Sequence, residues 1–152
     1  MVLNQFAIKR IAKDVKYIIK NPIKNIYYKH SDDNILNGYA LIIGNENVGK
    51  TSICKRMSGE QIDSYYDQTI GVEFSTCFTK IPGKLIKSQL WDTSGKKEFS
   101  PIIDSYYRGV AGVIIVYDVT DLKSFKKIPH WLNEIKKNKK DDENVNILLL
   151  GN

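Results

Sequence analysis

Residues 44–51 read Gly44-Asn45-Glu46-Asn47-Val48-Gly49-Lys50-Thr51 and match the motif G-x-x-x-x-G-K-S/T at every fixed position. The motif follows an apolar run at 39–43 and precedes a helical pattern at 50–58. Its glycines let the backbone turn tightly, so that successive N–H groups surround phosphate oxygens at the positive end of the following helix. We therefore expect a phosphate-binding loop between a strand and a helix.

This loop also predicts which side chains act on a bound nucleotide. Lys50 is expected to neutralise the β and γ phosphates, and Thr51 to place its hydroxyl group on Mg²⁺. The rest of the predicted phosphate-contacting set is Gly44, Asn47, Val48, Gly49 and Ser52. A phosphate loop alone does not distinguish ATP from GTP, so other segments must select the base.

The chain after residue 37 alternates short apolar runs with helical stretches, which predicts an α/β domain with a mainly parallel sheet. The expected strands cover 39–43, 70–79, 85–91, 111–118 and 145–150. The expected helices cover 50–58, about 98–107, and 121–138 with Asp121 as its N-cap. Because Pro82-Gly83 marks a tight turn, the second and third strands should form an antiparallel hairpin.

Length and composition limit the class of protein. A chain of 152 residues is the size of one domain, and 42% hydrophobic with 26% charged residues is typical of soluble proteins. Cys54 and Cys77 are too few for a disulfide framework or a zinc site. No apolar run approaches the roughly 18–20 residues that span a bilayer, and no secretory signal is present. We expect a cytoplasmic protein.

The net charge of +6 is concentrated in one segment. Residues 1–30 hold seven basic residues and one acidic residue, whereas the remainder is balanced. A nucleic-acid-binding core is therefore not indicated, and we expect no nucleic-acid partner. Apolar side chains at helical spacing over 3–19, opposite the basic ones, predict an amphipathic basic helix. We expect an N-terminal extension and linker over 1–37 and a globular domain over 38–152.

Three further segments carry a family resemblance. They are Asp67-Gln68-Thr69-Ile70-Gly71-Val72-Glu73-Phe74, Leu90-Trp91-Asp92-Thr93-Ser94-Gly95 and Tyr106-Tyr107-Arg108-Gly109. With the phosphate loop, their order and spacing resemble the small GTPases of the Ras superfamily. Ile-Gly-Val-Glu-Phe and Tyr-Tyr-Arg-Gly resemble the Rab branch in particular, as does the stretch 124–135. The resemblance covers about residues 38–152.

The resemblance implies a P-loop NTPase fold, in which helices cover both faces of the sheet. It also implies a GTP-binding switch of vesicle and membrane trafficking that converts GTP to GDP and phosphate. It implies Mg²⁺ ligands at Thr51, Thr69 and Asp92, and oxygen ligands suit this ion. It implies catalytic roles for Lys50, Thr69, Gly95 and Lys96. Gly95 would donate its backbone N–H to the γ phosphate, and Thr69 would release its loop when that phosphate leaves. The implied partners are exchange factors, activating proteins and effectors at a switch surface of Phe74, Trp91 and Tyr106.

The sequence departs from the family pattern in the hydrolytic part. Lys96 stands where the family has the glutamine that orients the attacking water, and a lysine has three donors but no acceptor. Glu46 places a carboxylate in the phosphate loop where a small residue is usual. We expect slow intrinsic hydrolysis.

The guanine-reading part departs as well. The family's base-stacking aromatic falls at Ile62, with Tyr65 and Tyr66 as substitutes, and we place Tyr66 in the nucleotide-binding set. The last residues, Leu150-Gly151-Asn152, resemble the opening of the family's N-K-x-D motif, which adds Asn152 to that set. The motif's lysine and aspartate and the later family elements are absent from this sequence, so the chain is a fragment or a naturally truncated protein. GTP preference then rests on kinship alone.

Several functions stay open. The leading hypothesis is a slow GTP-dependent switch, and the alternative is a non-catalytic Rab-like decoy or scaffold that holds regulators or effectors. An ATP-using P-loop enzyme is disfavoured because no adenine-binding segment is apparent. The basic segment 1–30 could bind an anionic membrane surface peripherally, or its helix could pack on the core or on a partner.

Overall fold

A computed structural model of the chain describes residues 35–62, 68–139 and 145–152. The strands are β1 (Ile35–Gly44), β2 (Val72–Ile81), β3 (Lys84–Thr93), β4 (Gly112–Tyr117) and β5 (Asn146–Gly151). The α-helices are α2 (Lys50–Ser58), α3 (Ser100–Ile103), α4 (Leu122–Lys126) and α5 (Ile128–Asn138). The short 3₁₀ helices η1 (Lys97–Phe99) and η2 (Asp104–Tyr107) flank α3.

The strands form one mixed sheet in the order β2-β3-β1-β4-β5. β1 lies parallel to β3 and β4, and β4 lies parallel to β5. Only β2 is antiparallel to its neighbour β3, and the turn between them contains Gly83 at φ 76°, a left-handed conformation that favours glycine. The predicted mainly parallel sheet and its antiparallel hairpin are confirmed.

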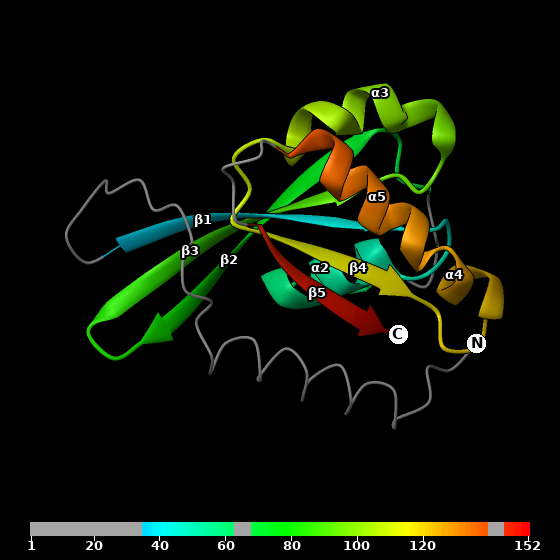
Figure 1. Ribbon diagram of the computed structural model, residues 1–152. Coiled ribbons are helices and arrows are strands. Elements are labelled where there is room, and N and C mark those ends of the chain that lie inside the picture. The colour runs from blue at the N-terminus through cyan, green and yellow to red at the C-terminus, as the bar shows by residue number, and fades with distance from the viewer. Residues whose placement is uncertain (1–34, 63–67, 140–144) are drawn as a thin grey trace.

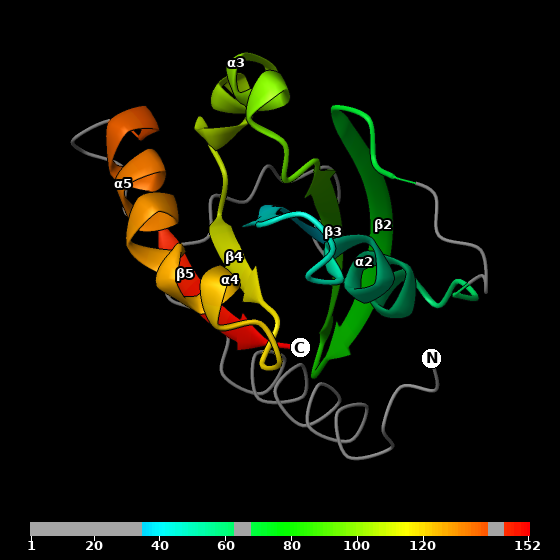
Figure 2. The ribbon, with the colours of Figure 1, turned by 90° about the vertical axis from the view of Figure 1, so that its right-hand side faces the viewer.

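The sheet is covered on both faces. α2 lies on one face, and α3 and α5 lie on the other (Figures 1 and 2). Successive residues of β1 alternate between these layers: Leu41 and Ile43 pack on the α5 side, and Ile42 packs on the α2 side. The central strands are therefore apolar on both faces, as buried parallel strands are.

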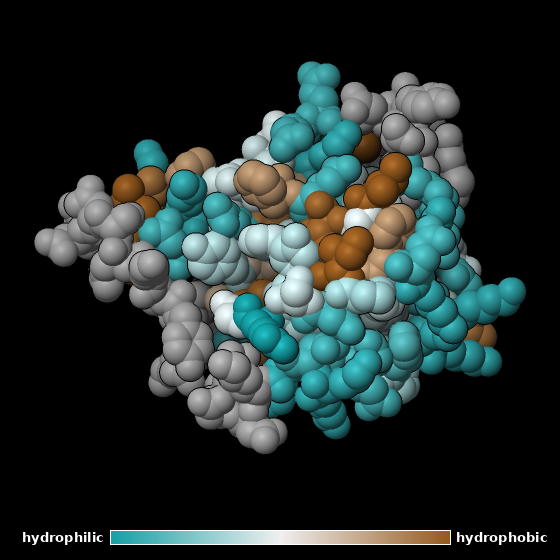
Figure 3. Space-filling model, turned by 90° about the horizontal axis from the view of Figure 1, so that it is seen from above, coloured by the Kyte–Doolittle hydropathy of each residue, from teal (hydrophilic) through white to brown (hydrophobic). Residues whose placement is uncertain are grey.

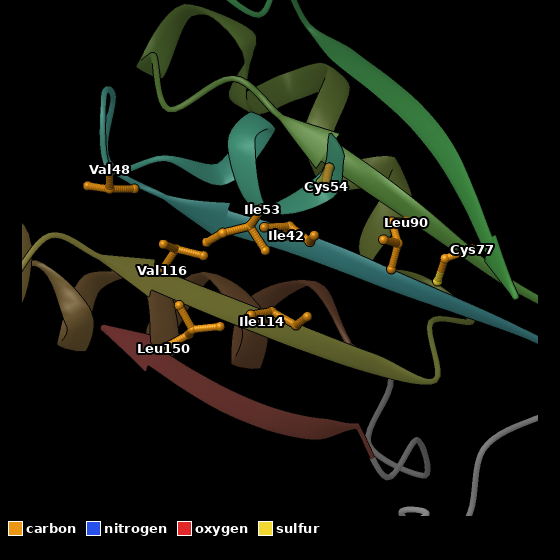
Figure 4. Packing of buried hydrophobic residues seen from close by; sticks show 9 residues of the cluster. All are labelled: Ile42, Val48, Ile53, Cys54, Cys77, Leu90, Ile114, Val116 and Leu150. Carbon is orange, nitrogen blue, oxygen red and sulfur yellow. The ribbon is translucent and has the colours of Figure 1, made fainter. Parts of the chain in front are cut away.

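The core on the α2 side reaches into the phosphate loop. Figure 4 shows this cluster, which consists of Ile42, Val48, Ile53, Cys54, Cys77, Leu90, Ile114, Val116 and Leu150. Val48 belongs to the loop itself and is 2% exposed, so the loop is anchored in the hydrophobic core. Ile53 extends the same anchor one turn into α2.

The helix expected over about 98–107 is present as three consecutive short pieces rather than as one α-helix. The chain instead forms η1, α3 and η2 in succession. Pro101 lies in the first turn of α3 and has no N–H to donate to the turn before it. The helical pattern is therefore divided into short pieces.

The helix expected over 121–138 is also divided, because α4 ends at Lys126 and α5 begins at Ile128. Pro129 lies in the first turn of α5, where its ring would collide with the carbonyl group of Phe125 in a continuous helix. The predicted N-cap is confirmed, since the Asp121 carboxylate accepts a 2.9 Å hydrogen bond from the Lys123 N–H.

β1 begins at Ile35, four residues before the expected strand, and pairs there with Leu85 of β3. The predicted basic helix and membrane-binding segment lie outside the described residues. The division of the chain at residues 37 and 38 stays a prediction, and β1 runs across that position from Ile35 to Gly44. No helix within 35–62, 68–139 or 145–152 has the length and apolar character needed to span a bilayer.

Ile135 tests how firmly α5 is attached to the sheet. Its side chain is 1% exposed and packs with Ile43 and Ile115. We expect Ile135→Ala to lower the free energy of unfolding by about 2–5 kcal/mol through loss of buried surface and the cavity left behind. Urea denaturation measures this change. The neighbouring exposed residue supplies the control, since Lys136→Ala should change stability by less than about 0.5 kcal/mol.

Candidate functional site

The phosphate loop turns sharply between β1 and α2. Gly44 has φ 146° and Gly49 has φ 91°, and Asn47 is a non-glycine residue with positive φ, at 60°. A Cβ atom on Gly44 would collide with the carbonyl group of Val116 on β4, so no larger residue fits there. The first glycine of the motif is thus required by the approach of the neighbouring strand.

Lys50 points into this loop. The side chain is buried, and its Nζ donates hydrogen bonds to the carbonyl oxygens of Gly44 at 3.1 Å and Asn45 at 2.6 Å. Burial lowers the pKa of the ammonium group to about 8, although the carboxylates of Asp92 and Glu46 act in the opposite direction. The loop therefore surrounds the Lys50 ammonium group, and its predicted contact with the β and γ phosphates stays a prediction.

The three predicted metal ligands lie together. The Thr51 hydroxyl donates to Asp92 Oδ2 at 2.6 Å and is 2.7 Å from the Thr69 hydroxyl, which is 3.4 Å from Asp92 Oδ2. Burial raises the pKa of Asp92, and the hydrogen bond from Thr51 opposes that rise. Asp92 Oδ1 is buried with no hydrogen-bond partner among the described residues.

This oxygen cluster fits a hard divalent cation. Two hydroxyls and a carboxylate with an unpaired buried oxygen are the donors that Mg²⁺ takes alongside phosphate and water. No group of three or more His, Cys, Asp or Glu side chains that could hold a metal occurs in the part of the chain that the structure describes. A cation at this site would therefore depend on the threonine hydroxyls as well as Asp92.

The loop after β3 closes over the phosphate loop. A Cβ atom on Gly95 would lie 2.8 Å from the carbonyl oxygen of Asn45, so only glycine permits this approach. The two loops and the segment before β2 border a small, partly open cavity of about 20 Å³. It is lined by Glu46, Asn47, Gly49, Lys50, Thr51, Gln68, Thr69, Thr93, Ser94, Gly95 and Lys96. Lys96 reaches this rim from a partly exposed position, with Nζ 3.9 Å from Glu98 Oε1.

The side chain of Asn152 contacts the backbone of the phosphate loop. Its side-chain N–H donates to the Val48 carbonyl oxygen at 2.9 Å, and its backbone exchanges hydrogen bonds with Tyr117 and Val119 after β4. A Cβ atom on Gly49 would collide with the Asn152 amide. The structure thus brings Asn152 to the predicted nucleotide-binding loop, in contact with its backbone.

The other residues of the predicted nucleotide-binding part that the structure describes have no contact with the phosphate loop among the hydrogen bonds given above. Ser52 follows Thr51 in the first turn of α2 and is partly exposed. Ile62 is 43% exposed. Tyr65 and Tyr66 lie outside the described residues, so the predicted base-stacking role of Tyr66 stays a prediction.

The comparison with known proteins agrees with this geometry. The Ras family matches residues 40–152. The chain belongs to the Ras family. It is similar to Ras-related protein RABD2b of Arabidopsis thaliana and Ras-related protein Rab-13 of Rattus norvegicus, each 46% identical over 112 residues. GTP-binding protein YPTM2 of Zea mays is 47% identical over 112 residues.

These relatives confirm the predicted Rab-like character of this Ras-family chain. Each alignment covers 74% of the chain and 54% of the relative. The chain therefore spans about half the length of the curated relatives it matches.

The residues predicted to form a switch surface in this Ras-family chain are neighbouring aromatic side chains whose rings are tilted relative to one another. Phe74 and Trp91 lie directly opposite each other on β2 and β3, and the Trp91 ring is 4.4 Å from that of Tyr106. Phe74 is 70% exposed. Figure 3 shows hydrophobic side chains gathered in the middle of the face that carries α3 and α5, with hydrophilic residues around them.

Sequence reasoning missed one contact to the phosphate loop. Trp131 of α5 donates a 3.0 Å hydrogen bond from its indole Nε1 to the side-chain oxygen of Asn45. The two residues are 86 positions apart in the sequence. Neither residue type at its position indicates this pairing, so the sequence offered no signal for it.

Asn152 provides a test of how the loop is supported. We expect Asn152→Ala to lower the free energy of unfolding by about 0.5–1.5 kcal/mol, because the Val48 carbonyl loses its side-chain partner. Hydrogen exchange of residues 45–49 should also become faster. Asn133→Ala, at an exposed position on α5, is the matched control and should leave both measurements nearly unchanged. Equal effects of the two substitutions would contradict the supporting role of Asn152.

Proposed function

We propose that this chain is a guanine-nucleotide-binding switch of Rab type that uses Mg²⁺ and hydrolyses GTP slowly. The observation that carries the proposal is that Lys50, Thr51 and Thr69 line one small cavity with Gly95, while Asp92 accepts the hydrogen bond from the Thr51 hydroxyl. These residues come from three separate segments of the chain, at 50–51, 69 and 92–95. Ras-family membership supports guanine as the base, and the names of the relatives support a role in trafficking.

Each part of the site has a distinct task in this proposal. The backbone N–H groups of 45–50 and the Lys50 ammonium group bind the β and γ phosphates. Thr51, Thr69 and Asp92 hold the cation, and a bound Mg²⁺ would supply charge neutralisation at the phosphates. Gly95 approaches the loop closely enough for its backbone N–H to serve the γ phosphate.

The same contacts explain how the site would act on partners. Thr69 lies three residues before β2, and the exposed Phe74 follows within that strand. Holding or releasing Thr69 would therefore reposition the start of β2 relative to Trp91 and Tyr106. Exchange factors, activating proteins and effectors that bind this aromatic surface would distinguish the two positions of β2.

Two side chains support the proposal of slow hydrolysis. Lys96 lines the cavity in the position that must orient water, but its ammonium group cannot accept a hydrogen bond from water. Glu46 also lines the cavity and brings a carboxylate near the phosphate positions. This carboxylate opposes the approach of the anionic γ phosphate.

The nucleotide content of the purified protein tests the proposed function. We expect denaturation to release GDP or GTP, identified by chromatography. Lys50→Ala should lower guanine-nucleotide affinity by at least roughly 100-fold, because several charge-assisted hydrogen bonds are lost together. Arg56→Ala, an exposed cation on the same helix, is the control and should bind normally. A protein that is empty and cannot be loaded would support the decoy or scaffold instead.

Lys96 makes the hydrolytic part of the proposal testable. We expect Lys96→Gln to raise the single-turnover rate of GTP hydrolysis by roughly 10- to 100-fold, because a glutamine both donates to and accepts from the attacking water. Measuring protein already loaded with GTP in excess Mg²⁺ separates rate from affinity. Lys97→Gln is the same substitution at the exposed neighbour and should have no effect. If Lys96→Gln is no faster than the parent, Lys96 is not the cause of slow hydrolysis.

A further inference from the structure

We propose that Trp131 is a positioning residue for the nucleotide site, acting through Asn45 of the phosphate loop. The inference rests on the proposed nucleotide binding and assigns part of its affinity to a helix outside the loops that touch phosphate. It starts from the 3.0 Å hydrogen bond between the Trp131 indole and the Asn45 side chain.

Asn45 is the point where three parts of the site meet. Its backbone carbonyl oxygen accepts the 2.6 Å hydrogen bond from Lys50 Nζ. The same carbonyl group lies against Gly95, so closely that a Cβ atom there would not fit. Its side-chain oxygen is held by Trp131. The orientation of this one residue therefore affects both the phosphate-binding cation and the loop that closes over it.

Trp131 is suited to hold Asn45 because α5 is fixed to the sheet. The indole packs against the hydrophobic cluster that contains Ile43, Ile115 and Ile135. One side of the Trp131 ring is thus set by the core, and its N–H is aimed at the loop. The hydrogen bond therefore connects the sharply turned phosphate loop to α5, which is packed on the sheet.

Nucleotide binding makes this restraint useful. A bound nucleotide would compete with the carbonyl oxygens of Gly44 and Asn45 for the three N–H donors of the Lys50 ammonium group. The Asn45 carbonyl group would then be held less firmly by Lys50. The hydrogen bond from Trp131 keeps the Asn45 peptide in place during that exchange and preserves its contact with Gly95. The phosphate loop is thereby partly ordered before the nucleotide binds, which lowers the entropy cost of binding.

The other tryptophan supplies a matched control. The chain contains two tryptophans, and the Trp91 Nε1 is buried without a hydrogen-bond partner among the described residues. Trp131→Phe and Trp91→Phe are the same chemical change, but only the first removes an N–H that is hydrogen-bonded to the phosphate loop. Both variants lose the extra ring volume of tryptophan, and the Asn45→Ala background then separates the hydrogen bond from packing.

The experiment measures dissociation of a fluorescent GDP analogue from the full chain in Mg²⁺. We expect Trp131→Phe to weaken affinity by about 2- to 12-fold relative to Trp91→Phe, the fold-change that corresponds to one neutral hydrogen bond. In an Asn45→Ala background, Trp131→Phe should add no further loss. In Trp91→Phe, where Trp131 is the remaining tryptophan, nucleotide should shift the tryptophan emission, and Asn45→Ala should remove most of that shift.

The outcomes separate this inference from the proposed function. A parent chain that binds no guanine nucleotide would overturn the proposed function, and the positioning role would fall with it. If the parent binds but the two tryptophan variants are equal, only the role of Trp131 is overturned. A loss in Trp131→Phe that persists unchanged without the Asn45 side chain would also overturn it, because packing would then be the cause.

Discussion

The approach of β4 and β5 to the phosphate loop is the constraint on which the other features depend. Gly44 lies against the Val116 carbonyl group, and Gly49 lies against the Asn152 amide. With side chains excluded at both glycines, the loop backbone can lie at the carboxyl ends of three parallel strands. Lys50 and Thr51 then begin α2 in a direction set by the sheet, and Val48 fills the core beneath them.

Charge is distributed within this frame so that a cation and a carboxylate share a buried space. The ammonium group of Lys50 has a lowered pKa because it is desolvated, and Asp92 has a raised pKa for the same reason. Each group partly offsets the cost of burying the other. Such a site is costly to the free protein and favours ligands that bring both negative oxygens and a divalent cation.

The two faces of the sheet have different tasks. The α2 side is a packed apolar layer that anchors the loop through Val48, and Figure 4 shows its side chains spread between α2 and the sheet. The opposite side carries α3, α5 and the aromatic surface of Phe74, Trp91 and Tyr106. Trp131 connects this side to the phosphate loop, so the face that would meet partners and the site that would bind nucleotide share a direct contact.

The sequence by itself determined the fold class, the approximate ranges of the strands, the antiparallel hairpin and the phosphate loop with Lys50 and Thr51. It could do so because motif spacing and strand periodicity are local properties of the chain. Thr69 and Asp92 were implied by the family resemblance, and the structure places both within hydrogen-bond distance of Thr51. Sequence reasoning failed at Pro101 and Pro129, where the loss of one N–H divided helices whose apolar pattern continued. Only the tertiary structure showed Asn152 behind the loop and Trp131 beside it. Those contacts join residues about 100 positions apart, and their partners are set by how α5 and β5 pack on the sheet.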